Sequence, residues 1–197
     1  MQGILTYLTD LERNNNREWF HDNRMQERAA RAEFEALLAE LIAALNRAGE
    51  ALPPLNPKDL TFKMQRDTRF SHDKSPYNPA FRAHISPMGK LPVPVGYYLL
   101  VRPGDRSFLG GGLFADMFKD ATNRVRVAIN DNGDEWAAIL RDPEFQSRFA
   151  VQGAALKRVP QGFDPLHPQA EYLKFKSWYL EVPVTDKQLL GADFVRE

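Results

Sequence analysis

Hydrophobic positions recur with a helical period in the first quarter of the chain. They lie three and four residues apart, at Phe34, Leu37, Leu38, Leu41, Ile42 and Leu45. This spacing is typical of an amphipathic helix that buries one face. Gly49 follows as a stop signal, and the proline-rich residues 53–57 predict a stiff connection. Before it, the asparagines at 14–16 predict a cap or tight turn for a helix that begins at Trp19.

The middle of the chain changes to a period of two, which is typical of β-strands. The predicted strands are residues 61–65, 81–85, 95–101 and 107–109. A turn at residues 103–106 joins the last two strands into a hairpin. Along residues 81–85 the alternation places Arg82 and His84 on one face of the strand.

The last third of the chain returns to helical patterns and adds one strand. The predicted elements are a helix around residues 125–129, a helix after the cap Asp142 and Pro143, a strand at 177–182 and a short helix at 185–190. Helices, a run of strands, helices and a final strand predict an α+β fold. We expect a single domain with a mostly antiparallel sheet and helices packed against it. Its parts are a helical N-terminal segment (1–48), a β meander (60–113), and helices plus a further strand (114–197).

Composition narrows the class of protein. A hydrophobic fraction of 43% in 197 residues is enough for a core, and 26% charged residues favour solubility. The chain has no cysteine, which excludes disulfides, Cys-ligated zinc and thiol nucleophiles. The sequence shows neither a signal peptide nor an apolar run near 18 residues, so we expect a cytoplasmic protein without a membrane partner. A net charge of zero argues against general nucleic-acid binding but leaves room for a local basic patch.

Such a patch lies in the residues around 66–77, which we call the basic loop. Between residues 63 and 84, five Lys or Arg stand against two Asp, a local charge of +3. Two arginines three residues apart can converge on one phosphate or carboxylate, because each guanidinium offers a planar fork of donors. Lysine adds a point charge, and serine and tyrosine add neutral donors. The predicted ligand-binding residues of this region are Arg66, Arg69, Ser71, Lys74, Tyr77 and Arg82.

The basic loop has a structural explanation as well. Asp67 and Asp73 could pair with the two arginines and pin a long loop, and both roles are compatible. A third interpretation is a non-catalytic interaction protein that grips an acidic protein or a nucleic acid through the same loop.

Glycines and histidines supply weaker signals. Gly110, Gly111 and Gly112 could let backbone N–H groups approach an anion, or they could mark a bulge or a close backbone approach. His84 is the candidate for proton transfer, because imidazole titrates near neutrality. His72, Asp73 and His84 would be the ligands of a metal-dependent hydrolase, but no paired histidine spacing supports this, and no metal ligand is assigned.

The chain resembles the bacterial family known as domain of unknown function 2461 over nearly its whole length. The resemblance is carried by NNNREWF at 14–20, RDTRFSHDKSPY at 66–77, SFLGGG at 107–112 and RVPQGF at 158–163. The chain departs from the family pattern at Asn78 and Gln161, where the family usually has Lys and Arg. The loss of Lys at position 78 removes one possible anion contact. The resemblance implies no established activity, cofactor or partner.

These observations predict a protein that binds a small phosphate- or carboxylate-bearing ligand at the basic loop. They leave open whether the protein is an enzyme and whether it uses a cofactor.

Overall fold

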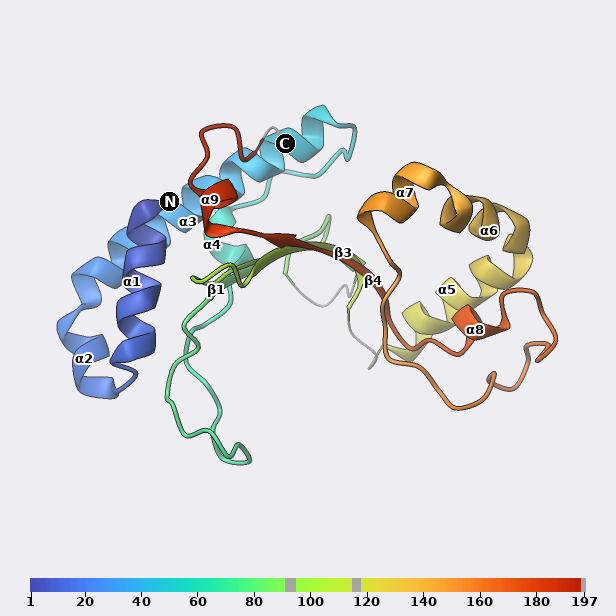
Figure 1. The fold of residues 1–197 in the computed structure, drawn as a ribbon, viewed down its shortest axis with the longest axis horizontal. Coiled ribbons are helices and arrows are strands. Elements are labelled where there is room, and N and C mark those ends of the chain that lie inside the picture. The colour runs from blue at the N-terminus through green and yellow to red at the C-terminus, as the bar shows by residue number, and fades with distance from the viewer. Residues whose placement is uncertain (91–94, 115–117, 196–197) are drawn as a thin grey trace. The chain divides into compact units, whose positions relative to one another are not determined.

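A computed structural model describes residues 1–90, 95–114 and 118–195, and it divides the chain into two compact units (Figure 1). The first unit is Met1–Pro92, Tyr98–Leu109 and Pro183–Glu197, and the second is Val93–Tyr97 and Gly110–Val182. The helices of the first unit are α1 (Gln2–Arg13), α2 (Arg17–Asp22), α3 (Arg24–Arg47), α4 (Pro57–Leu60) and α9 (Asp186–Leu189). Those of the second unit are α5 (Lys119–Asp131), α6 (Gly133–Arg141), α7 (Pro143–Arg148) and α8 (Ala170–Leu173).

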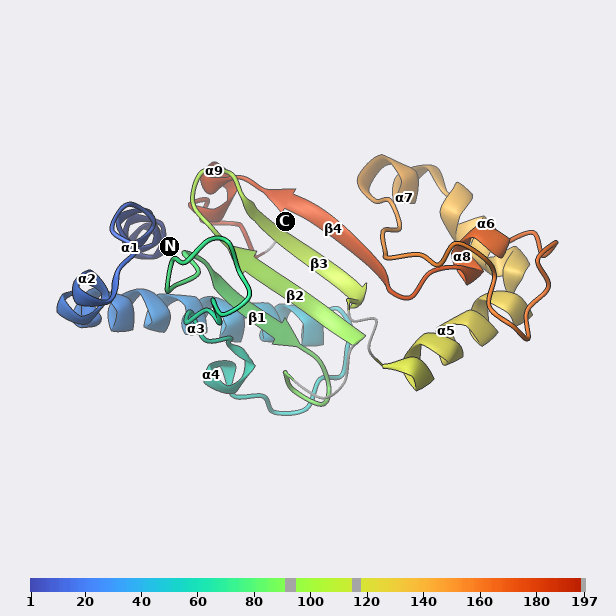
Figure 2. The ribbon, with the colours of Figure 1, turned by 90° about the horizontal axis from the view of Figure 1, so that it is seen from below.

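Four strands form one antiparallel sheet in the order β1-β2-β3-β4 (Figure 2). They are β1 (Phe81–Ile85), β2 (Val95–Val101), β3 (Ser107–Leu113) and β4 (Trp178–Val184). Each strand pairs with its neighbour in sequence; a short turn joins β2 to β3, whereas helices α5–α8 lie between β3 and β4 in the chain. The predicted α+β class with a helical N-terminal segment is confirmed.

The core of the first unit forms where α1, α3 and β1 meet. Leu8, Leu11, Phe34, Leu38 and Phe81 are completely or almost completely buried there. The predicted amphipathic helix is α3, which begins ten residues before its first predicted apolar position. It ends before Gly49, whose φ of +102° is a conformation that favours glycine.

The structure corrects the prediction of a strand at residues 61–65. This segment makes only two isolated bridges, Thr61 with Ala83 and Gln65 with Tyr77. Its first residues therefore pair with β1, while its last residues pair with the returning arm of the basic loop. Each pairing consists of one isolated bridge, which is too short to form a strand. The connection predicted at residues 53–57 lacks helix and strand as far as Asn56, and Pro57 then takes the first position of α4.

The sequence predicted the N-caps of two helices correctly. Asn16 caps α2, and its Oδ1 accepts a hydrogen bond from the Trp19 backbone N–H at 2.9 Å. Asp142 caps α7 in the same way, through the Phe145 N–H at 2.8 Å. The separate helix α1 was not predicted.

The second unit has its own apolar cluster, which includes Leu113, Ile129, Leu173 and Trp178. Arg126 of α5 ties this cluster to the segment before β4. Its guanidinium donates to the Leu173 and Phe175 carbonyl oxygens at 2.9 and 2.7 Å. Within the described residues, no helix is both long and apolar enough to span a bilayer.

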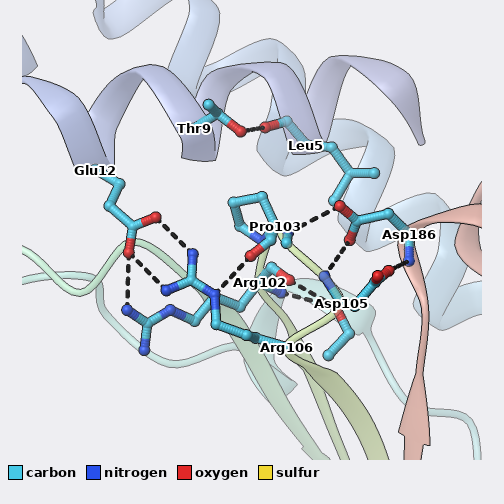
Figure 3. Close-up of polar contacts among 10 residues, drawn as sticks. Leu5, Thr9, Glu12, Arg102, Pro103, Asp105, Arg106 and Asp186 are labelled. Carbon is cyan, nitrogen blue, oxygen red and sulfur yellow. Dashed lines mark hydrogen bonds and ion pairs between the residues drawn. The ribbon is translucent and has the colours of Figure 1, made fainter.

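A carboxylate on α1 holds the turn between β2 and β3 (Figure 3). Glu12 accepts hydrogen bonds from Arg102 at 2.8 Å and from Arg106 at 3.0 and 2.5 Å. On the other side of the same turn, the Asp186 carboxylate accepts from the Gly104 N–H at 2.8 Å. In return, Asp105 accepts from the Asp186 N–H at 2.7 Å. The turn is therefore fastened to both α1 and α9.

We predict that Glu12→Gln destabilises the protein in a pH-dependent manner. The hydrogen bonds from Arg106 and then Arg102 lower the pKa of Glu12 from about 4.5 to about 2. A lowered folded-state pKa gives stability that is present above pH 4.5 and is lost as the pH falls toward 2. Because 35% of the Glu12 side chain is exposed, the expected loss in urea unfolding at pH 7 is only about 1 kcal/mol.

The difference between wild type and Glu12→Gln should shrink below pH 4.5 and vanish near pH 2. Glu40→Gln, on the exposed side of α3, is the control and should be neutral at every pH. A constant difference from pH 7 to pH 3 would contradict a role for the Glu12 charge.

We predict that Gly112→Ala destabilises the fold by about 2–3 kcal/mol. Gly112 has a φ of +127°, and an added Cβ would lie 2.3 Å from the Trp178 carbonyl oxygen. Gly111→Ala is a matched control, because its Cβ would meet only the Tyr97 ring at 3.8 Å. That variant should change the unfolding free energy by no more than about 0.5 kcal/mol. Equal effects of the two substitutions in urea unfolding would rule out this explanation.

Candidate functional site

The basic loop is attached to the N-terminal helices by the side chain of Asn15. Its Nδ2 donates to the Tyr77 carbonyl oxygen at 2.9 Å, and its Oδ1 accepts from the Tyr77 N–H at 3.1 Å. The amide group thus imitates the backbone of a neighbouring strand. The Tyr77 ring stacks on Phe20 of α2, with centroids 3.9 Å apart. These contacts bring together residues 62 positions apart in the sequence.

Both arginines of the loop have a carboxylate partner. Arg69 binds Asp67 through Nε at 2.9 Å and Nη2 at 2.6 Å. Arg66 binds Asp73 and also donates to the Ser75 carbonyl oxygen at 3.3 Å and the Ser71 hydroxyl at 3.4 Å. The ion pairs considered in the sequence analysis are therefore present.

These contacts lower the pKa values of both aspartates. For Asp67 the main cause is the side-chain hydrogen bond from Arg69. For Asp73 the cause is first the hydroxyl and backbone N–H of Ser75 and then Arg66. Both carboxylates are therefore ionised at neutral pH, and each cancels the charge of one arginine.

A groove of about 390 Å³ lies between the start of α2 and the basic loop. It is lined by Asn15, Asn16, Arg17, Gln65, Arg66, Thr68, Lys74, Pro76 and Tyr77. The lining contains three cationic side chains and no carboxylate. Lys74 donates to the Thr68 carbonyl oxygen at 2.9 Å, which leaves its charge uncompensated. Arg17 is exposed, and no ion pair or hydrogen bond joins its side chain to another described residue.

Only some of the predicted ligand-binding residues line the groove. Arg66, Lys74 and Tyr77 line the groove, and Ser71 supports Arg66 from behind. Arg69 lies outside the lining and is paired with Asp67. Further along the chain, Arg82 donates to the Lys63 carbonyl oxygen at 3.1 Å, and its guanidinium lies 5.5 Å from the centre of the Phe62 ring.

His84, the predicted proton-transfer residue, is buried in β1 with 6% exposure. Its Nδ1 lies 2.8 Å from the Lys90 carbonyl oxygen. A carbonyl only accepts hydrogen bonds, so Nδ1 carries the proton. Burial lowers the pKa of His84, against the opposing effect of the Lys90 and Gly89 backbone. The ring is therefore neutral at physiological pH.

Gly110, Gly111 and Gly112 belong to β3, which extends to Leu113 and not to Leu109 as predicted. They lie in the second unit, whereas the basic loop lies in the first. A Cβ on Gly110 would meet the Leu180 carbonyl oxygen at 2.9 Å. Together with the contact at Gly112, this close approach of two backbones explains why Gly110 and Gly112 carry no side chain.

The metal-dependent hydrolase hypothesis required His72, Asp73 and His84 to share a metal ion. Within the described residues, no three His, Asp or Glu side chains gather in a way that could hold one. Asp73 is instead engaged by Arg66 and Ser75.

Arg17 is the cationic groove residue that the sequence analysis missed. It is the first residue of α2, directly after the cap Asn16. The motif at 14–20 was interpreted only as a cap and as part of a family resemblance. A cation directly after a polar cap was the available signal, but nothing local indicated that the basic loop would lie beside it.

The fold and the groove define an α+β protein with a small groove lined by cationic side chains. The chain belongs to the family described as conserved hypothetical protein DUF2461, whose model matches residues 3–197. Neither the curated proteins nor the solved structures contain a match to the chain.

We predict that Asn15→Ala frees the basic loop. The variant loses two hydrogen bonds to Tyr77, each worth about 1 kcal/mol, so urea unfolding should show a loss of about 2 kcal/mol. Limited trypsin digestion should cut faster after Arg66 and Arg69. Asn14→Ala is the control, since the Asn14 amide donates only to Asp10 at the end of its own helix. Unchanged digestion of Asn15→Ala would contradict the attachment.

Proposed function

We propose that the protein binds a small phosphate-bearing anion in the groove between α2 and the basic loop. The observation that carries this proposal is the charge of the lining. Arg17, Arg66 and Lys74 face one groove whose described lining includes no carboxylate, and among these three cations only Arg66 has an acidic partner in the part of the chain that the structure describes. Clustered cations repel one another, so an anion between them would be held by charge-assisted hydrogen bonds.

The three cations would have different tasks. Arg66 is fixed by Asp73 and the Ser75 carbonyl oxygen, so it would lose little side-chain entropy on binding. Lys74 is held against Thr68 and has further N–H donors to offer. Arg17 is unrestrained and would close on the ligand with its planar fork. Asn15 would act indirectly, by keeping the two walls of the groove together.

The groove is larger than one inorganic phosphate requires. A volume of about 390 Å³ falls in the range of small-molecule sites. We therefore expect a phosphate ester with an organic part, found in the cytoplasm. The groove lining contains no histidine or carboxylate for acid–base chemistry. The geometry accordingly favours binding, and it does not favour the metal-dependent hydrolase. An acidic protein or a nucleic acid gripped by the same loop is the competing proposal.

We predict that Arg17→Gln and Lys74→Gln each weaken phosphate binding at least about tenfold. A hydrogen bond to a charged group is worth about 1.5–3 kcal/mol, and tenfold corresponds to 1.4 kcal/mol. The measurement is isothermal titration with pyrophosphate and a panel of sugar phosphates. A ligand at one hundred times its Kd should also stabilise the wild type by about 2.7 kcal/mol in thermal unfolding.

Arg28→Gln on α3 is the matched control, since it removes the same charge from an exposed arginine outside the groove. It should bind like the wild type. Equal affinity in all four proteins, or no binding of any phosphate to the wild type, would contradict the proposed function.

A further inference from the structure

The tip of the basic loop presents an aromatic ring to solvent. Phe70 is 96% exposed, more than any other large hydrophobic side chain in the described residues. It lies in a turn closed by the Ser71 N–H, which donates to the Thr68 carbonyl oxygen at 3.3 Å. Folding gains nothing from a ring in this position, because burial of apolar area is what stabilises a fold.

One face of this ring has a support. The guanidinium of Arg69 lies over the Phe70 ring, 5.9 Å from its centre. Arg69 is in turn held through two of its nitrogens by Asp67. The series Asp67–Arg69–Phe70 therefore supports the ring from one side and leaves its other face free. An aromatic face of this kind can stack on a flat partner.

The ring is also coupled to the groove. The carbonyl oxygen of Thr68 accepts from both the Ser71 N–H and the Lys74 ammonium. Thr68 and Lys74 line the groove. Phe70 follows Thr68 by two residues, which limits the separation of their Cα atoms to about 7 Å.

We infer that the ligand of the groove is a free nucleotide whose base stacks on the free face of Phe70. This inference rests on the proposed function, because the groove must hold the phosphate. Nucleotides combine a phosphate and a flat π-system, and this site offers cations and an aromatic platform side by side. The same combination of aromatic rings and cations binds single strands without reading their sequence.

The surroundings of Phe70 favour a flat partner over two other occupants. A protein pocket that enclosed the ring would contact both faces and displace Arg69 from Asp67. An anionic bilayer would meet one ring accompanied by the carboxylates of Asp67 and Asp73 on the same loop. A stacked base needs only the face that is free.

The experiment compares three probes on four proteins. The probes are pyrophosphate, adenosine diphosphate and a fluorescein-labelled oligonucleotide of eight deoxythymidines. The proteins are the wild type, Phe70→Ala, Phe70→Trp and Arg17→Gln. Titration calorimetry and fluorescence anisotropy give the affinities. Leu166→Ala, at an exposed leucine elsewhere in the chain, is a further control.

We expect Phe70→Ala to weaken the diphosphate or the oligonucleotide at least about fivefold, as loss of one stacked base should. Its affinity for pyrophosphate should be unchanged, and Phe70→Trp should restore binding, with quenched tryptophan fluorescence. Since two groove cations have no acidic partner, log K for the oligonucleotide should fall with log salt at a slope of about −1.4. Tighter binding of adenosine diphosphate than of the oligonucleotide supports the inference, and tighter binding of the oligonucleotide would overturn it in favour of the competing nucleic-acid proposal.

Two failures are distinguishable. If pyrophosphate binds in an Arg17-dependent manner but neither base-bearing probe responds to Phe70→Ala, the nucleotide inference is wrong and the groove remains an anion site. If pyrophosphate does not bind at all, the proposed function is wrong. Binding to vesicles of phosphatidylcholine and phosphatidylserine that is lost in Phe70→Ala, without nucleotide binding, would overturn the inference in favour of a membrane.

Discussion

The candidate site depends on the pairing of the Asn15 side chain with the backbone of Tyr77. The groove has one wall from the N-terminal helices and another from the basic loop, and this pair of hydrogen bonds joins them. Stacking of Tyr77 on Phe20 adds apolar burial to the same joint. An asparagine serves here because its amide carries a donor and an acceptor at the spacing of a peptide group. Aspartate or alanine could satisfy only one backbone group or none.

The aspartates of the basic loop then determine which of its cations have a charge available for an external anion. Arg66 and Arg69 each have an aspartate, so their charges are largely cancelled, while Lys74 has only a carbonyl oxygen. Exposed ion pairs contribute little to stability, so their main effect here is to fix side-chain positions. Arg66 is oriented toward the groove, and Arg69 lies against Phe70. In the basic loop, the aspartates and the Thr68 carbonyl oxygen thus hold each of these cationic side chains in a defined position.

Local patterns predicted the elements well and the site in part. The hydrophobic stripe of α3 and the caps Asn16 and Asp142 depend on neighbours within four residues, and the structure contains all of them. The loop cations Arg66 and Lys74 could be selected because they are close in sequence. Arg17 could not, since its place in the groove results from a contact between positions 15 and 77. The three glycines at 110–112 were interpreted as an anion cradle or as a close backbone approach, and the close approach of β4 is what Gly110 and Gly112 accommodate.

The sequence separation of the ion pairs indicates what each one stabilises. Glu12 joins residues 90 and 94 positions away and connects α1 to the hairpin, so it acts on the fold as a whole. The pairs of the basic loop span only two and seven positions. Pairs this local join no separate elements, and they can only shape the loop in which they lie. A loop that devotes two aspartates to its own conformation, while keeping Phe70 in solvent and Lys74 without an acidic partner among the described residues, has the properties on which the proposed binding function rests.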